Sequence, residues 1–298
     1  MSNRIVYTPK RGIQPSGAQK VGGRLLFVLI TLFFIFAGGI YAIRNPAWRI
    51  ARVQIEGARR VDARNLERDV FNMLAGSYFS LVPKNFYAFV DGQRIKEELR
   101  RIYPEIFDVQ IKRVGFDALH MRVEERGIWG ILCNDLRESE WIHGADTVAE
   151  EADSPDIPLQ EKNTACVYVD SSGFAFETAP NPIGSLIVRV RNDNKTVPVS
   201  ARVIESDSMD FMLLLAREIP RAIQEDAIGF EMLSRVPSEI RVMTSGRYEL
   251  WMARDRDVGE ALGALDTLLK QEIQEKKNNL EYADLRFGSK VFYKFKSQ

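Results

Sequence analysis

One uninterrupted apolar run stands out in the pattern of hydrophobic and polar positions along the chain. Residues Leu25–Ile43 contain no charged side chain, and Arg24 and Arg44 flank them. An α-helix rises about 1.5 Å per residue, so this run would span roughly 28 Å, close to the thickness of a bilayer's hydrocarbon core. No polar face interrupts the run, which argues against a helix in a soluble core. The pattern predicts a transmembrane helix over residues 25–43, with the lipid bilayer as its partner.

A cleaved signal peptide is the alternative interpretation of this run. Leu25–Phe36 would be its apolar core, and Ala37–Gly39 would be its small-residue cleavage region. The run continues through Ile40–Ile43, which a cleavage region does not need, so the anchor is favoured. Residues 1–24 are basic and rich in Gly, Ser and Pro, which predicts a disordered tail. Basic residues lie on both sides of the run, so the positive-inside rule leaves its orientation open.

The pattern predicts a strand, two helices and two further strands between residues 50 and 126. Ile50–Ile55 alternates with period two, and Asp62 can cap a helix in which Leu66, Val70 and Leu74 share a face. Asp91 can cap a second helix, which Pro104 stops. Inward-facing side chains of the last two strands are predicted at Phe107, Val109, Ile111, Leu119, Met121 and Val123. One apolar face per element predicts two layers, with the helices on a three-stranded sheet.

Residues 127–298 predict a second domain that is mostly β-sheet with two packed helices, which makes the fold class α+β. One helix would begin at an Asp207 cap and meet Pro220, and the other would run from Val258 to about Lys277. Strands are predicted over Ile128–Cys133, Val167–Asp170, Phe174–Phe176, Leu186–Val190, Ile228–Leu233, Ile240–Met243, Tyr248–Met252, Tyr282–Phe287 and Val291–Phe295. Residues 134–163 are acidic and without clean periodicity, which predicts a flexible insertion.

Composition removes several functional classes. Lys plus Arg and Asp plus Glu number 41 each, so the chain has no basic excess for nucleic acid. Two histidines and two cysteines leave little material for a metal site. No phosphate-binding loop or nucleophile elbow occurs, and Glu124 and Glu125 would point to opposite faces of their strand. We therefore expect no enzyme activity, no cofactor and no small-molecule substrate.

Cys133 and Cys166 flank the acidic insertion, one on each neighbouring strand. If these strands pair, a disulfide could join them and close a loop of about 33 residues, contributing about 3–4 kcal/mol by chain entropy. Two buried free thiols are an equal alternative. A disulfide would indicate an oxidising compartment.

The final predicted strand is the best binding candidate. Lysines alternate there with apolar residues through Lys290, Val291, Phe292, Tyr293, Lys294 and Phe295. A last strand often lies at a sheet edge, where lysines block uncontrolled pairing. The same edge is what a partner strand needs for β-augmentation. The pattern alone favours an ordinary protected edge.

Several motifs, in their order along the chain, resemble the FtsQ/DivIB family of bacterial cell-division proteins. Val53–Gly57 resembles the opening strand of that family, and Leu119–Arg126 followed by Trp129 resembles its strand ending in Glu-Arg. Tyr168–Phe176 is similar to the motif Val-Asp-x-x-Gly-x-x-Phe, and Ala283–Phe287 to the terminal Asp-Leu-Arg-Tyr. Gly127 departs from the usual proline, and the acidic insertion is longer than expected.

The resemblance implies a non-enzymatic scaffold of the divisome at the division septum. It implies a single-pass protein of the cytoplasmic membrane, with a cytoplasmic N-terminus and with a POTRA domain (residues 50–126) and a β domain outside. The implied partners are the FtsB and FtsL proteins, with FtsB adding a strand to the C-terminal edge. Arg286, Phe287 and the strand Lys290–Phe295 are then the expected partner site. A POTRA-bearing chaperone or export component and a membrane-anchored extracytoplasmic enzyme of unknown chemistry are the alternatives.

Overall fold

A computed structural model describes residues 17–78, 82–134, 166–181, 186–192, 197–233, 236, 238–288 and 290–296. The first part of the predicted tail and almost all of the predicted acidic insertion lie outside the described residues. The chain divides into two compact units. The first unit comprises Met1–Ala58, Asp62–Lys96 and Gln110–Arg122, and the second comprises Arg59–Val61, Glu97–Val109 and Val123–Gln298.

A long apolar helix opens the described chain. Helix α1 spans Gly17–Arg44, so the prediction of a disordered tail as far as residue 24 is wrong at its end. Its stretch Arg24–Ile43 is long and apolar enough to cross a membrane and has no buried residues. The Thr31 hydroxyl donates to the Phe27 carbonyl at 2.9 Å, which satisfies it within the helix. By length and composition, this helix could be a membrane anchor or a signal sequence.

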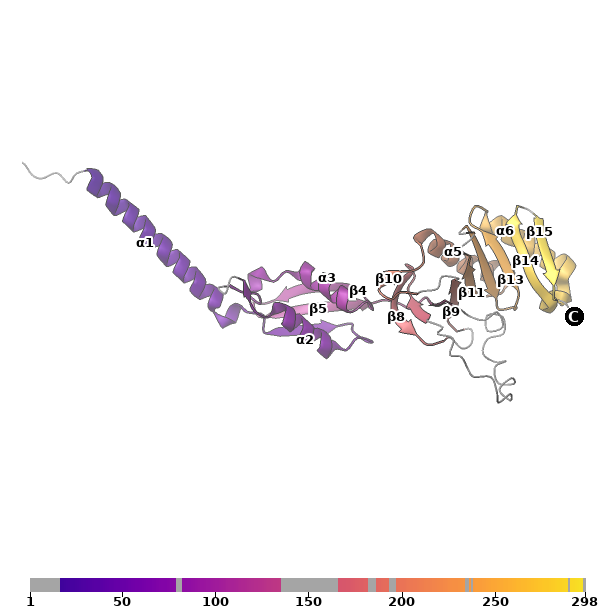
Figure 1. Ribbon diagram of the computed structural model, residues 1–298, viewed down its shortest axis with the longest axis horizontal. Helices are drawn as coiled ribbons and strands as arrows, with labels where there is room; N and C mark the ends of the chain where they lie inside the picture. Colours follow the sequence, from indigo (N-terminus) through magenta and orange to yellow (C-terminus); the bar gives the residue numbers. More distant parts are fainter. Residues whose placement is uncertain are drawn as a thin grey trace, which may run out of the picture. The chain divides into compact units, whose positions relative to one another are not determined.

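The predicted order of strand, helix, helix, strand and strand is confirmed (Figure 1). The elements are β1 (Arg52–Glu56), α2 (Ala63–Leu74), α3 (Gly92–Ile102), β4 (Ile106–Val114) and β5 (Ala118–Glu125). Their sheet has the order β1-β5-β4, with β1 parallel to β5. Asp62 and Asp91 cap their helices as predicted, because their carboxylates accept the backbone N–H groups of Arg64 and Gln93. The connection between the helices contains β2 (Ser77–Tyr78), β3 (Val82–Pro83) and the short helix Tyr87–Phe89.

Of the predicted inward positions of β4, Val109 is confirmed, Ile111 is half-buried and Phe107 is wrong. Ile106 and Val109 are buried, whereas Phe107 is 48% exposed. The Phe107 ring lies 5.5 Å from the guanidinium carbon of Arg126, which gives this exposed ring a tertiary contact. The predicted inward residues of β5, which are Leu119, Met121 and Val123, are all buried.

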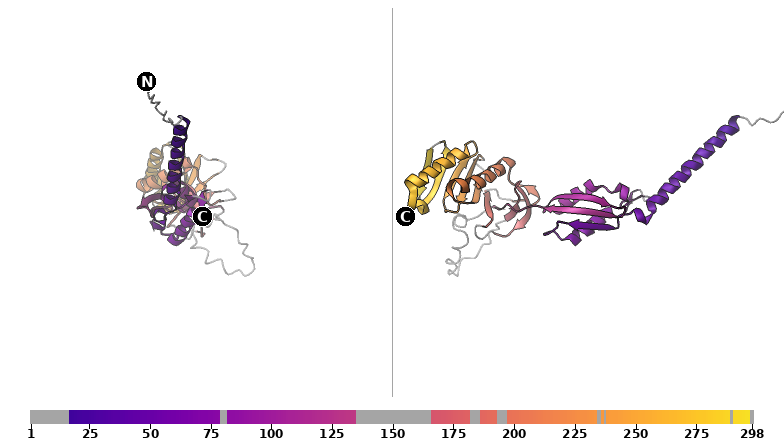
Figure 2. Two further views of the ribbon diagram at one scale, coloured as in Figure 1. Left: turned by 90° about the vertical axis from the view of Figure 1, so that its left-hand side faces the viewer. Right: turned by 180° about the vertical axis from the view of Figure 1, so that it is seen from behind.

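The second unit is built on a large mixed sheet. Its strands are β6 (Gly130–Cys133), β7 (Cys166–Val169), β8 (Phe174–Ala179), β9 (Val188–Asn192), β10 (Ala201–Arg202), β11 (Ala227–Met232), β12 (Glu239–Thr244), β13 (Glu249–Ala253), β14 (Leu280–Phe287) and β15 (Lys290–Phe295). Among the described residues they follow the order β10-β8-β7-β6-β9-β11-β12-β13-β14-β15. Helices α5 (Ser206–Ile223) and α6 (Val258–Leu268) cover one face of this sheet (Figure 2, right). Their apolar sides pack with alternate residues of the strands into one core.

Several predicted boundaries in this unit shift. Asp207 does not cap α5, since the helix begins at Ser206 with Glu205 at its N-cap, and Asp207 lies in the first turn. Pro220 lies inside α5, which continues to Ile223. The α-helical part of the last predicted helix ends at Leu268, and the chain continues through π and 3₁₀ turns to Asn279. The strand predicted at Leu186 begins at Val188, and β10 was not predicted.

Candidate partner-binding site

Strand β15 lies at one edge of the ten-stranded sheet, as predicted. It pairs with β14 in antiparallel register, with Tyr282 opposite Lys294, Ala283 opposite Tyr293 and Asp284 opposite Phe292. Within the described part of the chain, no strand pairs with the other side of β15. Its outer side is therefore where a further strand could add to the sheet.

The register identifies which main-chain groups point outward. The N–H of Lys296 donates to the Asn279 carbonyl at 2.8 Å, so it points toward β14. Successive residues of an antiparallel strand direct their N–H and C=O groups alternately to the two sides. The main-chain groups of Lys294 and Phe292 therefore also point toward β14. Those of Val291, Tyr293 and Phe295 point outward, which makes them the groups a partner strand would meet.

The side chains of β15 divide between the two faces of the sheet. Val291 and Phe295 are half-buried and pack against the core beneath the helices. Phe292, on the opposite face, is 54% exposed, and its ring meets that of Phe287 edge to face at 5.5 Å. Lys294 Nζ lies 2.8 Å from Glu281 Oε2, and this hydrogen-bonded partner raises the pKa of the lysine amine. The Phe287–Phe292 pair and the ion-paired Lys294 therefore lie beside the main-chain groups that point outward.

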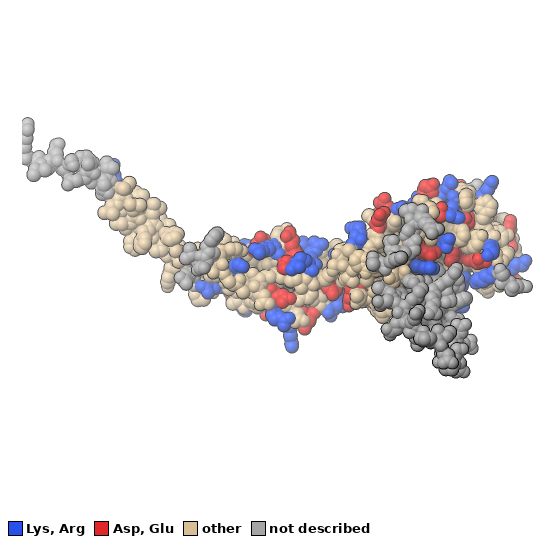
Figure 3. Space-filling model, viewed as in Figure 1, with Lys and Arg blue, Asp and Glu red and all other residues tan. Residues whose placement is uncertain are grey.

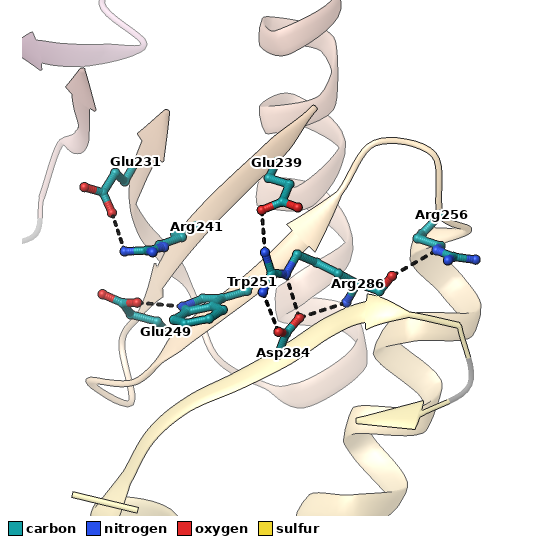
Figure 4. Close-up of polar contacts among 8 residues, drawn as sticks. All are labelled: Glu231, Glu239, Arg241, Glu249, Trp251, Arg256, Asp284 and Arg286. Carbon is teal, nitrogen blue, oxygen red and sulfur yellow. Dashed lines mark hydrogen bonds and ion pairs between the residues drawn. The ribbon is translucent and has the colours of Figure 1, made fainter. Parts of the chain in front are cut away.

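A continuous array of charged and aromatic side chains covers the neighbouring strands on the face away from α5 and α6, here called the outer face (Figure 4). Trp251 of β13 is its centre and stacks on Tyr282 at 4.3 Å between ring centroids. The guanidinium carbons of Arg241 and Arg286 lie 4.6 and 5.0 Å from the Trp251 ring. Trp251 Nε1 donates to Glu249 at 2.8 Å. Stacking and cation–π contacts of this kind fix the rings and the cations in one arrangement.

Arg286, an expected partner contact, is bound within the sheet. Its Nε and Nη2 donate to the two oxygens of Asp284 at 2.8 and 2.6 Å, and Nη1 donates to Glu239 at 2.5 Å (Figure 4). The hydrogen bond to Asp284 is the largest cause that raises the pKa of this guanidinium, and burial opposes it. The Arg286 guanidinium already binds two carboxylates, so its role is to hold the side chains of the outer face in place. Phe287, by contrast, is 53% exposed beside Phe292.

Sequence reasoning missed most of this outer-face array. Glu239, Arg241, Trp251 and Tyr282 come from three strands; the last three were predicted only as strand residues, and Glu239 lay just before a predicted strand. The signal was alternation: Ile240, Val242, Leu250 and Ala283 are core residues, so their neighbours face outward together. What the pattern lacks is strand order, which places Arg241 and Trp251 opposite each other in the ladder.

The cysteines and the remaining polar candidates have structural partners. Cys133 and Cys166 lie directly opposite each other on β6 and β7 and form a disulfide, with 4.2 Å between their Cα atoms.

Glu125 accepts hydrogen bonds from the backbone N–H groups of Arg59, Arg60 and Val61. Burial raises the pKa of the Glu125 carboxyl, but these hydrogen bonds outweigh burial, so the pKa is lowered. Among the described residues no cluster of His, Cys, Asp and Glu could hold a metal ion.

Neither a family model nor a curated protein matches the sequence of this chain.

Proposed function

We propose that this protein is a non-enzymatic scaffold of the bacterial divisome, anchored by α1 in the cytoplasmic membrane. In this proposal its extracytoplasmic domains recruit membrane division proteins that resemble FtsB and FtsL. The β1-α2-α3-β4-β5 order agrees with the POTRA domain that the sequence resemblance implies. The Cys133–Cys166 disulfide agrees with an extracytoplasmic, oxidising location.

The outward main chain of β15 is the observation that carries the proposal. Val291, Tyr293 and Phe295 present donors and acceptors at an edge that no described strand covers. An extended segment of an FtsB-like protein would bind there as a further strand, in the manner of β-augmentation. The exposed Phe287–Phe292 pair and Lys290 would then favour a partner with apolar and acidic side chains.

The test is a single proline substitution in β15 that prevents a partner strand from pairing with its outer edge. Tyr293→Pro removes an N–H group that points away from β14, so the β14–β15 ladder keeps its hydrogen bonds. The preceding residue, Phe292, is already extended, as a residue before proline prefers. We expect the affinity of the full chain in nanodiscs for the extracytoplasmic part of an FtsB-like protein to fall at least about tenfold, which corresponds to about 1.4 kcal/mol.

The matched control is Tyr293→Ala, which loses the same side chain but keeps the N–H group. It should bind much more tightly than Tyr293→Pro, and the melting temperatures of the two variants should be similar. Equal affinities for both variants and for the unchanged chain would contradict strand addition at this edge. Tight binding of unrelated extended peptides would instead indicate the chaperone or export function.

A further inference from the structure

Three segments of the first unit meet at the end where α1 joins it. They are Asn45–Ala51, the loop after α2, and the turn between β4 and β5. The Ile50 N–H donates to the Asn85 carbonyl, and the Ala51 N–H donates to the Asp117 carbonyl, both at 2.8 Å. The fold causes this meeting, because β1 runs away from α1 while α2 and β4 return toward it.

These segments bring five aromatic rings together, here called the aromatic end. They are Trp48, Phe86, Tyr87, Phe89 and Phe116. Trp48 stacks on Phe116 with ring centroids 5.5 Å apart and on Phe86 at 6.2 Å. Phe89 and Tyr87 extend the cluster, with centroids 5.6 Å from Phe86 and 5.5 Å from Phe116 respectively. The cluster is one connected set drawn from segments far apart in the sequence.

Three of the five rings of the aromatic end are exposed, while Phe86 beneath them is buried and Tyr87 is half-buried. Phe116 is 57% exposed, Phe89 51% and Trp48 44%, and Val114 beside them is 50% exposed. A connected group of exposed large apolar residues is unusual on a water-facing surface and marks a contact with something apolar.

Cations border the rings. The Arg113 guanidinium carbon lies 5.3 Å from the Tyr87 ring, and Lys84, two residues before Phe86, has its Nζ 5.9 Å from the ring of Tyr78, which lies outside the aromatic end. Arg52 is exposed and pairs with Asp117 at 2.8 Å. Aromatic rings with lysine and arginine at their margin suit the headgroup layer of a bilayer, where the rings reach the acyl boundary and the cations meet phosphates.

The connection to α1 is too short to lift this surface far from a membrane that α1 crosses. Four residue steps separate Arg44 from Trp48, which is at most about 14 Å of extended chain. The connection is also ordered, since the Asn45 N–H donates to the Ala42 carbonyl at 3.1 Å and the Asn45 side chain caps the short helix Pro46–Trp48. The headgroup layer is itself about 5–7 Å thick on each side of the hydrocarbon core.

We propose that the aromatic end is a lipid-binding surface that rests in the headgroup layer of the membrane crossed by α1. The inference rests on α1 being an anchor, as in the proposed function. The phospholipid interface would take Phe89, Phe116 and Trp48 at its acyl boundary. Lys84 and Arg113 would meet the phosphates. The surface would thereby limit rocking of the first unit about its connection to α1.

The test places a fluorescent probe on this surface. The full chain with Val114→Cys has a single free thiol among the described residues, because Cys133 and Cys166 are joined. It is labelled with a nitrobenzoxadiazole dye and reconstituted in phosphatidylcholine–phosphatidylglycerol vesicles that carry a doxyl quencher near the headgroups. The matched control is Arg64→Cys, at the start of α2 and therefore at the opposite end of β1. We expect quenching at residue 114 to be at least about threefold greater than at residue 64.

A second variant tests whether the aromatic rings, rather than the short connection to α1, bring residue 114 close to the lipid. Phe89→Ser with Phe116→Ser in the Val114→Cys chain removes two rings that are more than half exposed. We expect its quenching to fall to the level of the residue 64 control, with an unchanged melting temperature. Unchanged quenching would show that the connection alone brings residue 114 to the lipid and would overturn the proposal.

Flotation of the same vesicles reports on the anchor separately. A chain that floats with the lipid but shows no excess quenching at residue 114 would overturn the lipid surface alone and leave this end for a protein partner. A chain that does not float would overturn the anchor and this inference with it.

Discussion

At the scale of single residues, Arg126 and Asp170 explain why two of the sequence motifs take the form they do. Arg126 Nη1 donates to Asp170 Oδ2 at 2.5 Å, Nε donates to the Pro104 carbonyl at 2.9 Å, and both charged side chains are buried. The Phe174 ring lies 4.0 Å from the guanidinium carbon. The other Asp170 oxygen holds the turn by accepting from Ser172 and Phe174. The Glu-Arg and Val-Asp motifs are therefore structural partners within the second unit.

Asp170 should make stability depend on pH. Burial raises the pKa of this carboxyl, but the bonds from Ser172, Phe174 and Arg126 outweigh it, and the pKa lies below its ordinary value. A carboxyl with a lowered folded-state pKa stabilises the fold fully above its unfolded-state pKa, about 3.9, and loses that contribution as the pH falls through the folded-state value. Asp170→Asn should therefore reduce the free energy of unfolding at pH 7 by about 3 kcal/mol.

The same substitution should flatten the pH dependence of unfolding below about pH 4, because the titrating group is gone. Urea denaturation in detergent solution at pH 7 and pH 3.5 measures both effects. Asp210→Asn is the control, since Asp210 is exposed on α5 and its loss should change stability by less than about 0.5 kcal/mol. An equal loss in both variants would refute the role of the Arg126–Asp170 pair.

Contacts between residues close in sequence could be predicted, whereas contacts between distant residues could not. Both halves of the Arg126–Asp170 pair lie in recognisable motifs, but 44 residues separate them, and no local pattern predicts their contact. The caps at Asp62 and Asp91 could be predicted because each bond closes within a few residues. The resemblance assigned Arg286 to a partner, but Asp284 holds it from two positions earlier on β14, and Glu239 reaches it through strand order, which the sequence does not show.

At the scale of elements, alternation predicted most strands, and tertiary contacts overrode it where it failed. In β4, Val109 is buried as predicted, but Phe107 is exposed beside Arg126 and Ile106 is buried instead. Helix α5 begins at Ser206 because the preceding Ile204 is buried and its N–H donates to Gly173. The Ile204 carbonyl oxygen also lies close to Gly173, because a Cβ added to this glycine would meet that oxygen at 2.4 Å. Such contacts are set by the packing of β8 and β10.

The disulfide that joins β6 and β7 should stabilise the second unit. The disulfide closes a loop with a sequence separation of 33, and the loss of its chain-entropy contribution should reduce the free energy of unfolding by about 3–4 kcal/mol. Cys133→Ala, Cys166→Ala and the double variant should each lose most of this amount, because either single change opens the loop. Urea denaturation of the three variants measures it. Losses that simply add in the double variant would indicate side-chain packing as the cause.

At the scale of the whole molecule, the open choice for α1 is between an anchor and a cleaved signal sequence. We predict that the mature protein retains Leu25–Ile43, because the apolar stretch continues past Ala37–Gly39 to Ile43 (Figure 3). The mass of the protein purified from membranes would then include the segment before Gly39, and alkaline carbonate would not extract it. A mature N-terminus close to Gly39 would contradict the anchor.

The outward groups of β15 have a consequence for how such a site would change in evolution. A main-chain N–H or C=O is present in every residue except proline, which lacks the N–H, so mutation of Val291, Tyr293 or Phe295 to most other residues leaves the hydrogen-bonding pattern intact. The ability to bind would then persist while the side chains drift. Discrimination between partners would reside in the neighbouring Phe287, Lys290 and Phe292, whose replacement retunes selectivity without removing the strand. Two lineages could thus keep the same mode of pairing while their partner pairs become mutually incompatible.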